Sequence, residues 1–180
     1  MLRISLLNEK EYGMKKSVKN VSILGLCTAL ALILAYVEIL LPPLLASVPG
    51  VKIGLPNIVI ILVLYKFGVK SAAAVSFIRI ALVSMLFGNA MALIYSLAGA
   101  TLSLLVMALL KKTNLFSYVG VSISGGVFHN VGQILTAMLL LETVGIGYYL
   151  IVLTVTGTIS GILVGLCGAI AIKNNFLKRY

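Results

Sequence analysis

Long apolar stretches separated by short polar connections make up most of this chain. The stretches lie at residues 21–41, 54–66, 70–88, 90–110, 118–141 and 148–172. An α-helix needs about 20 apolar residues to cross the hydrocarbon core of a bilayer, and most of these stretches match that length. The second is shorter and has Pro56 near its start, a position that a helix tolerates. The pattern predicts an all-α membrane protein with six transmembrane helices in one bundle.

The two ends of the chain are polar. Residues 1–20 are predicted to form a cytoplasmic tail or a short surface helix, residues 21–172 the membrane domain, and residues 173–180 a second cytoplasmic tail. A basic segment before an apolar stretch is also typical of a signal peptide. The first stretch is too long for one and lacks a small-residue cleavage site, so we expect it to be retained as the first span.

The composition agrees with a chain that is solvated by lipid. Of 180 residues, 61% are hydrophobic and 10% are charged, whereas a soluble domain carries about 25% charged residues. The mean hydropathy is +1.18. A chain of this length and composition predicts one compact membrane domain.

The basic residues predict how the bundle is oriented. The polar ends and the connections after the second and fourth stretches hold twelve Lys or Arg, whereas the other three connections hold only Lys52. Because positive residues collect on the cytoplasmic side, both termini are predicted to be cytoplasmic. The net charge of +10 is then expected to meet anionic lipid headgroups, and not nucleic acid.

The acidic residues argue against metal-dependent catalysis. The four acids are all Glu and the chain has no Asp, so the carboxylate clusters that hold magnesium are missing. Cys27 and Cys167 have no metal-ligand spacing, and no P-loop motif occurs. We expect no catalytic residue, no metal and no cofactor, and any ATP must be hydrolysed by a partner.

Polar groups at membrane depth are the first candidates for a binding site, because burying them in lipid is costly. Arg79 lies near the middle of the third stretch, and His129, Asn130 and Gln133 lie in the fifth. Glu38 and Glu142 are expected at outer helix ends, which leaves Arg79 without an acidic partner at its own depth. The alternative is a structural hydrogen-bond network between the third and fifth helices.

The outer connections supply further candidates. Lys52 lies between Gly50 and Gly54, close to Asn57 at the start of the second stretch. A lysine beside free backbone N–H groups and a helix N-terminus could bind an anion; the alternative is a rigid turn with a solvated lysine. Asn89, in the hairpin between the third and fourth stretches, is included in the expected substrate site. Glu38 is expected either to pair with Lys52 or to be a solvated helix end.

Small residues at four-residue spacing predict close helix packing in lipid. In the sixth stretch, Gly157, Gly161 and Gly165 are expected to pack within the chain. In the first stretch, small residues form a candidate partner interface as well as a candidate internal contact: Gly25, Ala29, Ala31 and Ala35.

Two motifs carry a family resemblance: Pro-Gly-Val-Lys-Ile-Gly-Leu-Pro-Asn-Ile at 49–58 and Gly-Val-Phe-His-Asn-Val-Gly-Gln at 126–133. Over nearly all of the chain after residue 20, the sequence resembles the heptaprenyl diphosphate synthase component I family, also called the Gx transporter family. Pro56 stands where a small residue is expected. The older name implies prenyl diphosphate synthesis, but prenyl synthases hold magnesium with Asp-rich motifs that this chain does not have.

That family looks like the substrate-binding S components of energy-coupling factor (ECF) transporters. The resemblance implies a ligand bound from outside, a membrane T component that contacts the first helix, and two cytoplasmic ATPase subunits. We therefore expect an S component that binds a small anionic or partly lipophilic molecule. A non-catalytic accessory subunit of polyprenyl diphosphate or quinone synthesis is the second hypothesis, and a proton-coupled carrier using His129 and Glu142 is the third.

Overall fold

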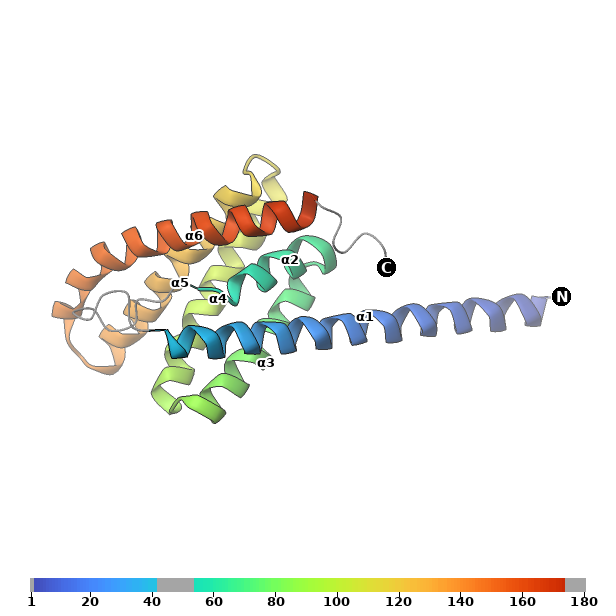
Figure 1. The fold of residues 1–180 in the computed structure, drawn as a ribbon, viewed down its shortest axis with the longest axis horizontal. Coiled ribbons are helices and arrows are strands. Elements are labelled where there is room, and N and C mark those ends of the chain that lie inside the picture. Colours follow the sequence, from blue (N-terminus) through green and yellow to red (C-terminus); the bar gives the residue numbers. More distant parts are fainter. Residues whose placement is uncertain (1, 42–53, 174–180) are drawn as a thin grey trace.

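Helices account for nearly all of the chain that the structure describes. This computed structural model describes residues 2–41 and 54–173, with side chains from Ser17 onward. The elements in chain order are α1 (Leu2–Leu40), α2 (Asn57–Phe67), α3 (Val69–Phe87), α4 (Ala90–Thr113), α5 (Tyr118–Leu140), the 3-10 turn η1 (Val144–Tyr148) and α6 (Tyr149–Lys173) (Figure 1). No strand occurs in these ranges, which confirms the prediction of an all-α protein.

Five of the described helices are long and apolar enough to cross a membrane, so the protein is a multi-pass membrane protein. The exception is α2, which has 11 residues and extends for about 16 Å at the usual helical rise. It therefore reaches only partway across a hydrocarbon core of about 30 Å. The second of the six predicted crossings is thus a short helix.

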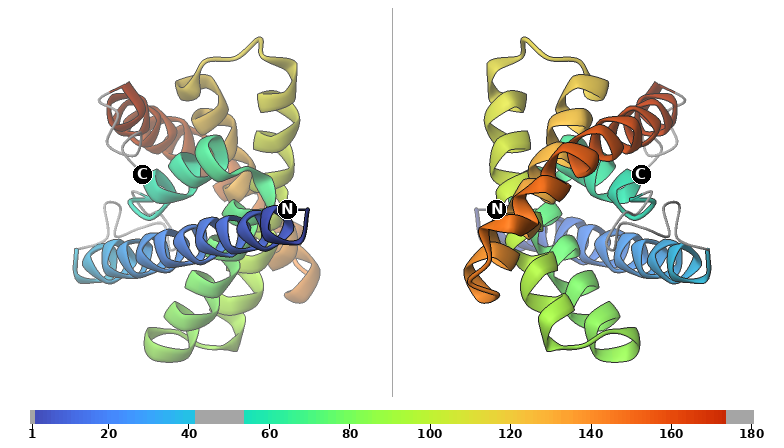
Figure 2. Two further views of the ribbon diagram at one scale, coloured as in Figure 1. Left: turned by 90° about the vertical axis from the view of Figure 1, so that its right-hand side faces the viewer. Right: turned by 90° about the vertical axis from the view of Figure 1, so that its left-hand side faces the viewer.

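The first helix is longer than predicted. It runs without a break from Leu2 to Leu40, and its first half projects beyond the other helices (Figures 1 and 2). The described part of the predicted N-terminal tail therefore continues the first span. Its sequence contains no proline and is rich in Leu, Lys and Glu, which are good helix formers.

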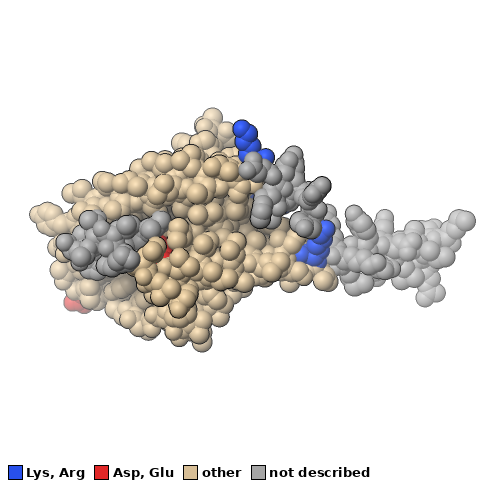
Figure 3. Space-filling model, in the orientation of Figure 1, with Lys and Arg blue, Asp and Glu red and all other residues tan. Residues whose placement is uncertain are grey.

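The two ends of the bundle differ in charge. Lys66 ends α2, Lys111 and Lys112 end α4, and Lys173 ends α6, and all of these helix ends lie on the side away from Glu38 and Glu142. Figure 3 shows basic side chains toward one end of the molecule and acidic ones toward the other. We refer to the lysine-rich side as the basic end.

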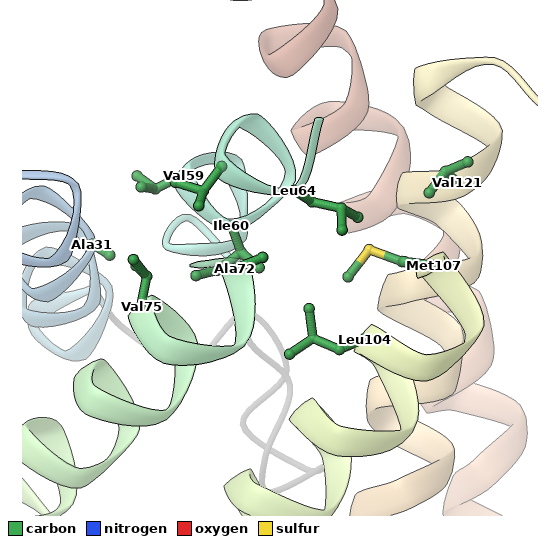
Figure 4. Close-up of a cluster of buried hydrophobic side chains, with 10 residues drawn as sticks. Ala31, Val59, Ile60, Leu64, Ala72, Val75, Leu104, Met107 and Val121 are labelled. Atoms are coloured by element: carbon green, nitrogen blue, oxygen red, sulfur yellow. The ribbon is translucent and has the colours of Figure 1, made fainter. Parts of the chain in front are cut away.

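Helix α2 lies in the middle of the apolar core. Val63 and Leu64 are fully buried, in one cluster with Val75 of α3 and Leu104 of α4 (Figure 4). At the C-terminal end of α2, Lys111 Nζ donates a hydrogen bond to the Leu64 carbonyl at 2.7 Å. This bond satisfies a carbonyl that the helix end leaves unpaired, and it ties α2 to α4.

Glycines allow α5 and α6 to approach closely. A Cβ on Gly157 would lie 3.0 Å from the Gly126 carbonyl oxygen, one on Gly161 would lie 2.5 Å from Ile123 Cα, and one on Gly165 would lie 2.7 Å from Val119 Cα. All three of these neighbours are backbone atoms of α5 and cannot move aside as a side chain could. The prediction that these small residues pack within the chain is confirmed.

Candidate functional site

A polar cavity lies between the helix halves that are remote from the basic end. It encloses about 810 Å³ of empty space, its open mouth included, and it receives residues from all six α-helices and from the segment before α2. Its polar lining residues are Glu38, Asn57, Arg79, Ser84, Ser96, His129, Asn130, Gln133 and Ser160. So many polar groups in an apolar bundle mark this cavity as the candidate site.

The cavity brings together most of the residues that the sequence analysis selected. The predicted substrate-site residues that line it are Asn57, Arg79, His129, Asn130 and Gln133. Three separate segments of the sequence thus converge on one space, with Asn57 from α2, Arg79 from α3 and the other three from α5. Lys52 lies outside the described residues.

Arg79 has an unused donor. Its side chain is partly buried and lines the cavity, and its Nε–H is buried with no hydrogen-bond partner among the described residues. A guanidinium offers five N–H donors in a fixed planar arrangement that suits carboxylate and phosphate oxygens. A buried donor without an acceptor is costly, so this one is suited to an acceptor supplied by a ligand.

Glu38 lies at the site, which corrects the expectation that no acid is near Arg79. It lines the same cavity, and its charge attracts the Arg79 guanidinium. Its carboxylate accepts a hydrogen bond from the Gly54 N–H. Glu38 is therefore not a solvated helix end, and its expected pairing with Lys52 stays a prediction because Lys52 lies outside the described residues. The signal in the sequence was its spacing: Glu38 follows Ala31 and Ala35 at helical intervals, on the face that α1 buries.

Gly54 lines the cavity wall beside Glu38, to which its N–H donates. Its φ is +77°, and a Cβ there would lie 3.0 Å from Ser160 Oγ and 3.2 Å from Asn57 Nδ2. Glycine alone combines this left-handed conformation with the small volume that the site leaves. Gly54 thus brings the backbone to Glu38 and places Asn57 at the start of α2.

Asn130 and His129 contribute to helix packing as well as to the cavity. The Asn130 side-chain amide donates to the Leu153 carbonyl of α6 at 2.6 Å. His129 lies where α4 and α5 cross closely. A Cβ on Gly99 of α4 would lie 2.7 Å from the carbonyl oxygen of His129 and 3.1 Å from the Cε1 of its ring. These contacts join α5 to α6 and to α4, whereas the structural alternative predicted a network between α3 and α5. The residues at the floor of the cavity thus also pack helices together.

Asn89 has a different role from the one the sequence analysis gave it. It is exposed and does not line the cavity. Its side-chain oxygen accepts a hydrogen bond from the Ala92 N–H at 2.8 Å, which caps the first turn of α4. Asparagine is among the best N-cap residues, and this preference accounts for its position.

The small residues of α1 lie on two faces. Gly25 and Ala29 are exposed, and a Cβ on Gly25 would meet nothing within 4 Å. Ala31 and Ala35 are 0% and 6% exposed, and Figure 4 shows Ala31 facing Val75 of α3. In this structure Ala31 and Ala35 are covered by the chain itself, which leaves Gly25 and Ala29 as the accessible part of the predicted interface.

Comparisons with known proteins place the chain in one family. The comparison with curated proteins found no match, and the comparison with solved structures found none either. The family model described as heptaprenyl diphosphate synthase component I matches residues 27–170. The match covers most of the chain, including every described residue of the cavity, and the chain therefore belongs to this family.

Proposed function

We propose that this member of the heptaprenyl diphosphate synthase component I family is the substrate-binding S component of an ECF-type importer. It binds a small anionic molecule in the cavity around Arg79, with its mouth toward the outside of a bacterial cell membrane. The observation that carries the proposal is Arg79, whose side chain lines a polar cavity and whose buried Nε–H has no acceptor among the described residues. The amides of Asn57 and Gln133, in the same lining, would supply neutral contacts.

The charge distribution supports an outward-facing cavity. The basic helix ends carry Lys66, Lys111, Lys112 and Lys173, and the cavity residues lie in the opposite halves of the same helices. If the basic end is cytoplasmic, as positive residues prefer, the cavity lies in the outer half of the membrane. A ligand captured from outside would then reach Arg79 without crossing the apolar cluster around Leu64.

A second candidate function is supported by the family description itself. A component I could be a non-catalytic membrane subunit that holds a soluble prenyl diphosphate synthase subunit at the membrane. The exposed lysines Lys66 and Lys112 at the basic end are suited to docking an acidic surface of such a partner. The cavity would then be available for an anionic prenyl precursor.

The carrier hypothesis has less support. It requires His129 and Glu142 to act together, but Glu142 is exposed just after α5 and does not line the cavity that contains His129. A proton passed from one to the other would have to leave the cavity.

Identifying the partner decides between the two candidates. The full chain is affinity-purified from its own cells and its partners are identified by mass spectrometry. Recovery of a membrane T component with two ATPases supports the importer, and recovery of a soluble prenyl synthase subunit without them supports the accessory subunit. Uptake that continues in cells lacking every ECF ATPase would contradict the importer proposal.

The exposed part of α1 provides a matched pair of variants for the same experiment. Gly25→Leu places a large side chain where a Cβ meets nothing within 4 Å, so the isolated fold should tolerate it. We expect this variant to lose the T component, because close helix approach in lipid needs small residues. Gly25→Ala, which keeps the surface small, should retain it.

A further inference from the structure

A second, smaller compartment continues the cavity toward the basic end of the bundle. It encloses about 290 Å³ of empty space, its open side included, and it lies between α2, α4, α5 and α6. Asn57, Gly126 and Ser160 line both spaces. The two spaces are therefore adjacent, and a molecule bound at Arg79 would reach the second compartment by passing these three residues.

The chemistry of the inner compartment differs from that of the cavity. Its side walls include Ile61, Met107 and Val164. Ser103 and Ser122 also line it, and the Ser103 hydroxyl donates to the Gly125 carbonyl at 2.8 Å, so that donor is already used. Among the residues that the structure describes, no charged one lines the compartment, whereas the cavity contains both Arg79 and Glu38.

Apolar side chains also lie beyond the inner compartment. Leu64 is about one helical turn past Ile61, and Val121 about one turn before Gly125, both toward the basic end. With Met107 they belong to one buried cluster, in which side chains of α2, α4 and α5 converge (Figure 4). The compartment is thus an apolar extension of a polar cavity, with the buried cluster at its inner end.

We infer that the ligand of this protein is amphipathic, with an anionic head at Arg79 and a short aliphatic tail in the compartment lined by Ile61, Met107 and Val164. This inference rests on the proposed function and names its substrate class. The head is a carboxylate or a phosphate, since both match the guanidinium. Burying the tail among apolar side chains adds affinity in proportion to the area removed from water.

The test uses two pairs of probes, and the members of each pair share a head and differ in their tail. Binding of methyl phosphate and butyl phosphate to the purified full-length protein is measured by calorimetry, with acetate and pentanoate as the carboxylate pair and 1-butanol as the probe without charge. We expect the longer member of one pair to bind more tightly by about fourfold for each methylene that becomes buried. Butanol should not bind measurably.

Val164→Leu then tests where the tail lies. The variant adds one methylene to the wall of the inner compartment and should remove most of the preference for the longer probe, while the shorter probe binds as before. Val155→Leu is the matched control, because Val155 is an exposed residue of the same helix and the same substitution there should preserve the preference. Unchanged binding of the short probe also shows that the variant is folded.

The outcomes separate this inference from the function on which it rests. Equal affinity for the short and long probes in the wild-type protein, or an undiminished preference in Val164→Leu, would overturn the inference and leave the anion site intact. Failure of every anionic probe to bind the wild-type protein would overturn both. The pair that binds, phosphates or carboxylates, identifies the head.

Discussion

Glu38 at the end of α1 and Arg79 in the middle of α3 face the same cavity, and their opposite charges attract each other. The attraction acts between two helices that also pack together through Ala31 and Val75. Each of the two side chains also has a hydrogen-bonding group to satisfy. Glu38 accepts the Gly54 N–H, and the Nε–H of Arg79 has no acceptor among the described residues. The guanidinium therefore keeps a donor that a ligand could use.

Arg79 should be a binding residue, and its substitution should affect affinity more than folding. We expect Arg79→Met to weaken binding of an anionic probe by about tenfold to a hundredfold, the usual worth of a hydrogen bond to a charged group. Arg79→Lys should lose less, because it keeps the charge without the planar geometry. Affinity and melting temperature are measured on the same purified variants. Unchanged affinity with a large fall in melting temperature would make Arg79 a structural residue.

Glu38→Gln tests whether the ligand carries only negative charge. The amide oxygen of glutamine can still accept the Gly54 N–H, so the contact near the cavity wall is kept. Removing a negative charge from the site should raise the affinity for an anionic ligand by about threefold or more. Calorimetric titration at low ionic strength measures the change. Weaker binding would instead indicate a zwitterionic ligand whose positive group uses Glu38.

Asn89 should contribute to stability and not to binding. Asn89→Ala removes the cap of α4 and is expected to cost about 1 kcal/mol of stability. Ser117→Ala is the matched control, because Ser117 caps α5 in the same way through the Gly120 N–H at 3.2 Å. Both variants should lower the melting temperature by similar amounts. If Asn89→Ala lowered ligand affinity and Ser117→Ala did not, Asn89 would be a ligand-binding residue after all.

The α5–α6 contact should be intolerant of a single methyl group. Gly161→Ala places a Cβ 2.5 Å from Ile123 Cα, and such overpacking is expected to cost about 1–3 kcal/mol. Gly25→Ala, at a position open to its surroundings, should leave stability unchanged or slightly improved. Thermal unfolding in detergent compares the two. Equal melting temperatures would mean that α6 can move away from α5 without cost.

The orientation of the bundle can be tested by cysteine labelling of intact cells. Both native cysteines, the partly buried Cys27 and the exposed Cys167, are first replaced by alanine. A cysteine at exposed Asn89 should react with an impermeant reagent from outside, and one at exposed Lys112 only after permeabilisation. The opposite pattern would place the cavity mouth in the cytoplasm and contradict capture of a ligand from outside.

The sequence predicts the helices well because lipid imposes a simple rule on their length and composition. Helix α5 was expected at 118–141 and lies at Tyr118–Leu140, and α6 was expected at 148–172 and lies at Tyr149–Lys173. The start of α1 was missed, because charged residues that are good helix formers can continue a span as readily as they can form a tail.

The site was predicted in part. Arg79 and the 129–133 segment could be found from polarity alone, since each is conspicuous in an apolar stretch. The positions of Glu38, which lines the cavity, and of Asn89, which caps α4, were not foreseen, because each depends on which way a side chain points at a helix end. The inner compartment has no signal in the sequence, because Ile61, Met107 and Val164 are ordinary residues for a transmembrane helix until packing leaves a space between them.

The shortness of α2 has a consequence for electrical work across the membrane. The cavity reaches the first residue of α2, Asn57, and the helix then extends for about 16 Å to the basic end. If water fills the cavity, most of the membrane voltage falls across α2 and its neighbours, and little of it above Asn57. A charged ligand would then enter nearly free of voltage. Its later release at the basic end would move the charge through nearly the whole membrane potential, which corresponds to about 2.3 kcal/mol per charge at 100 mV.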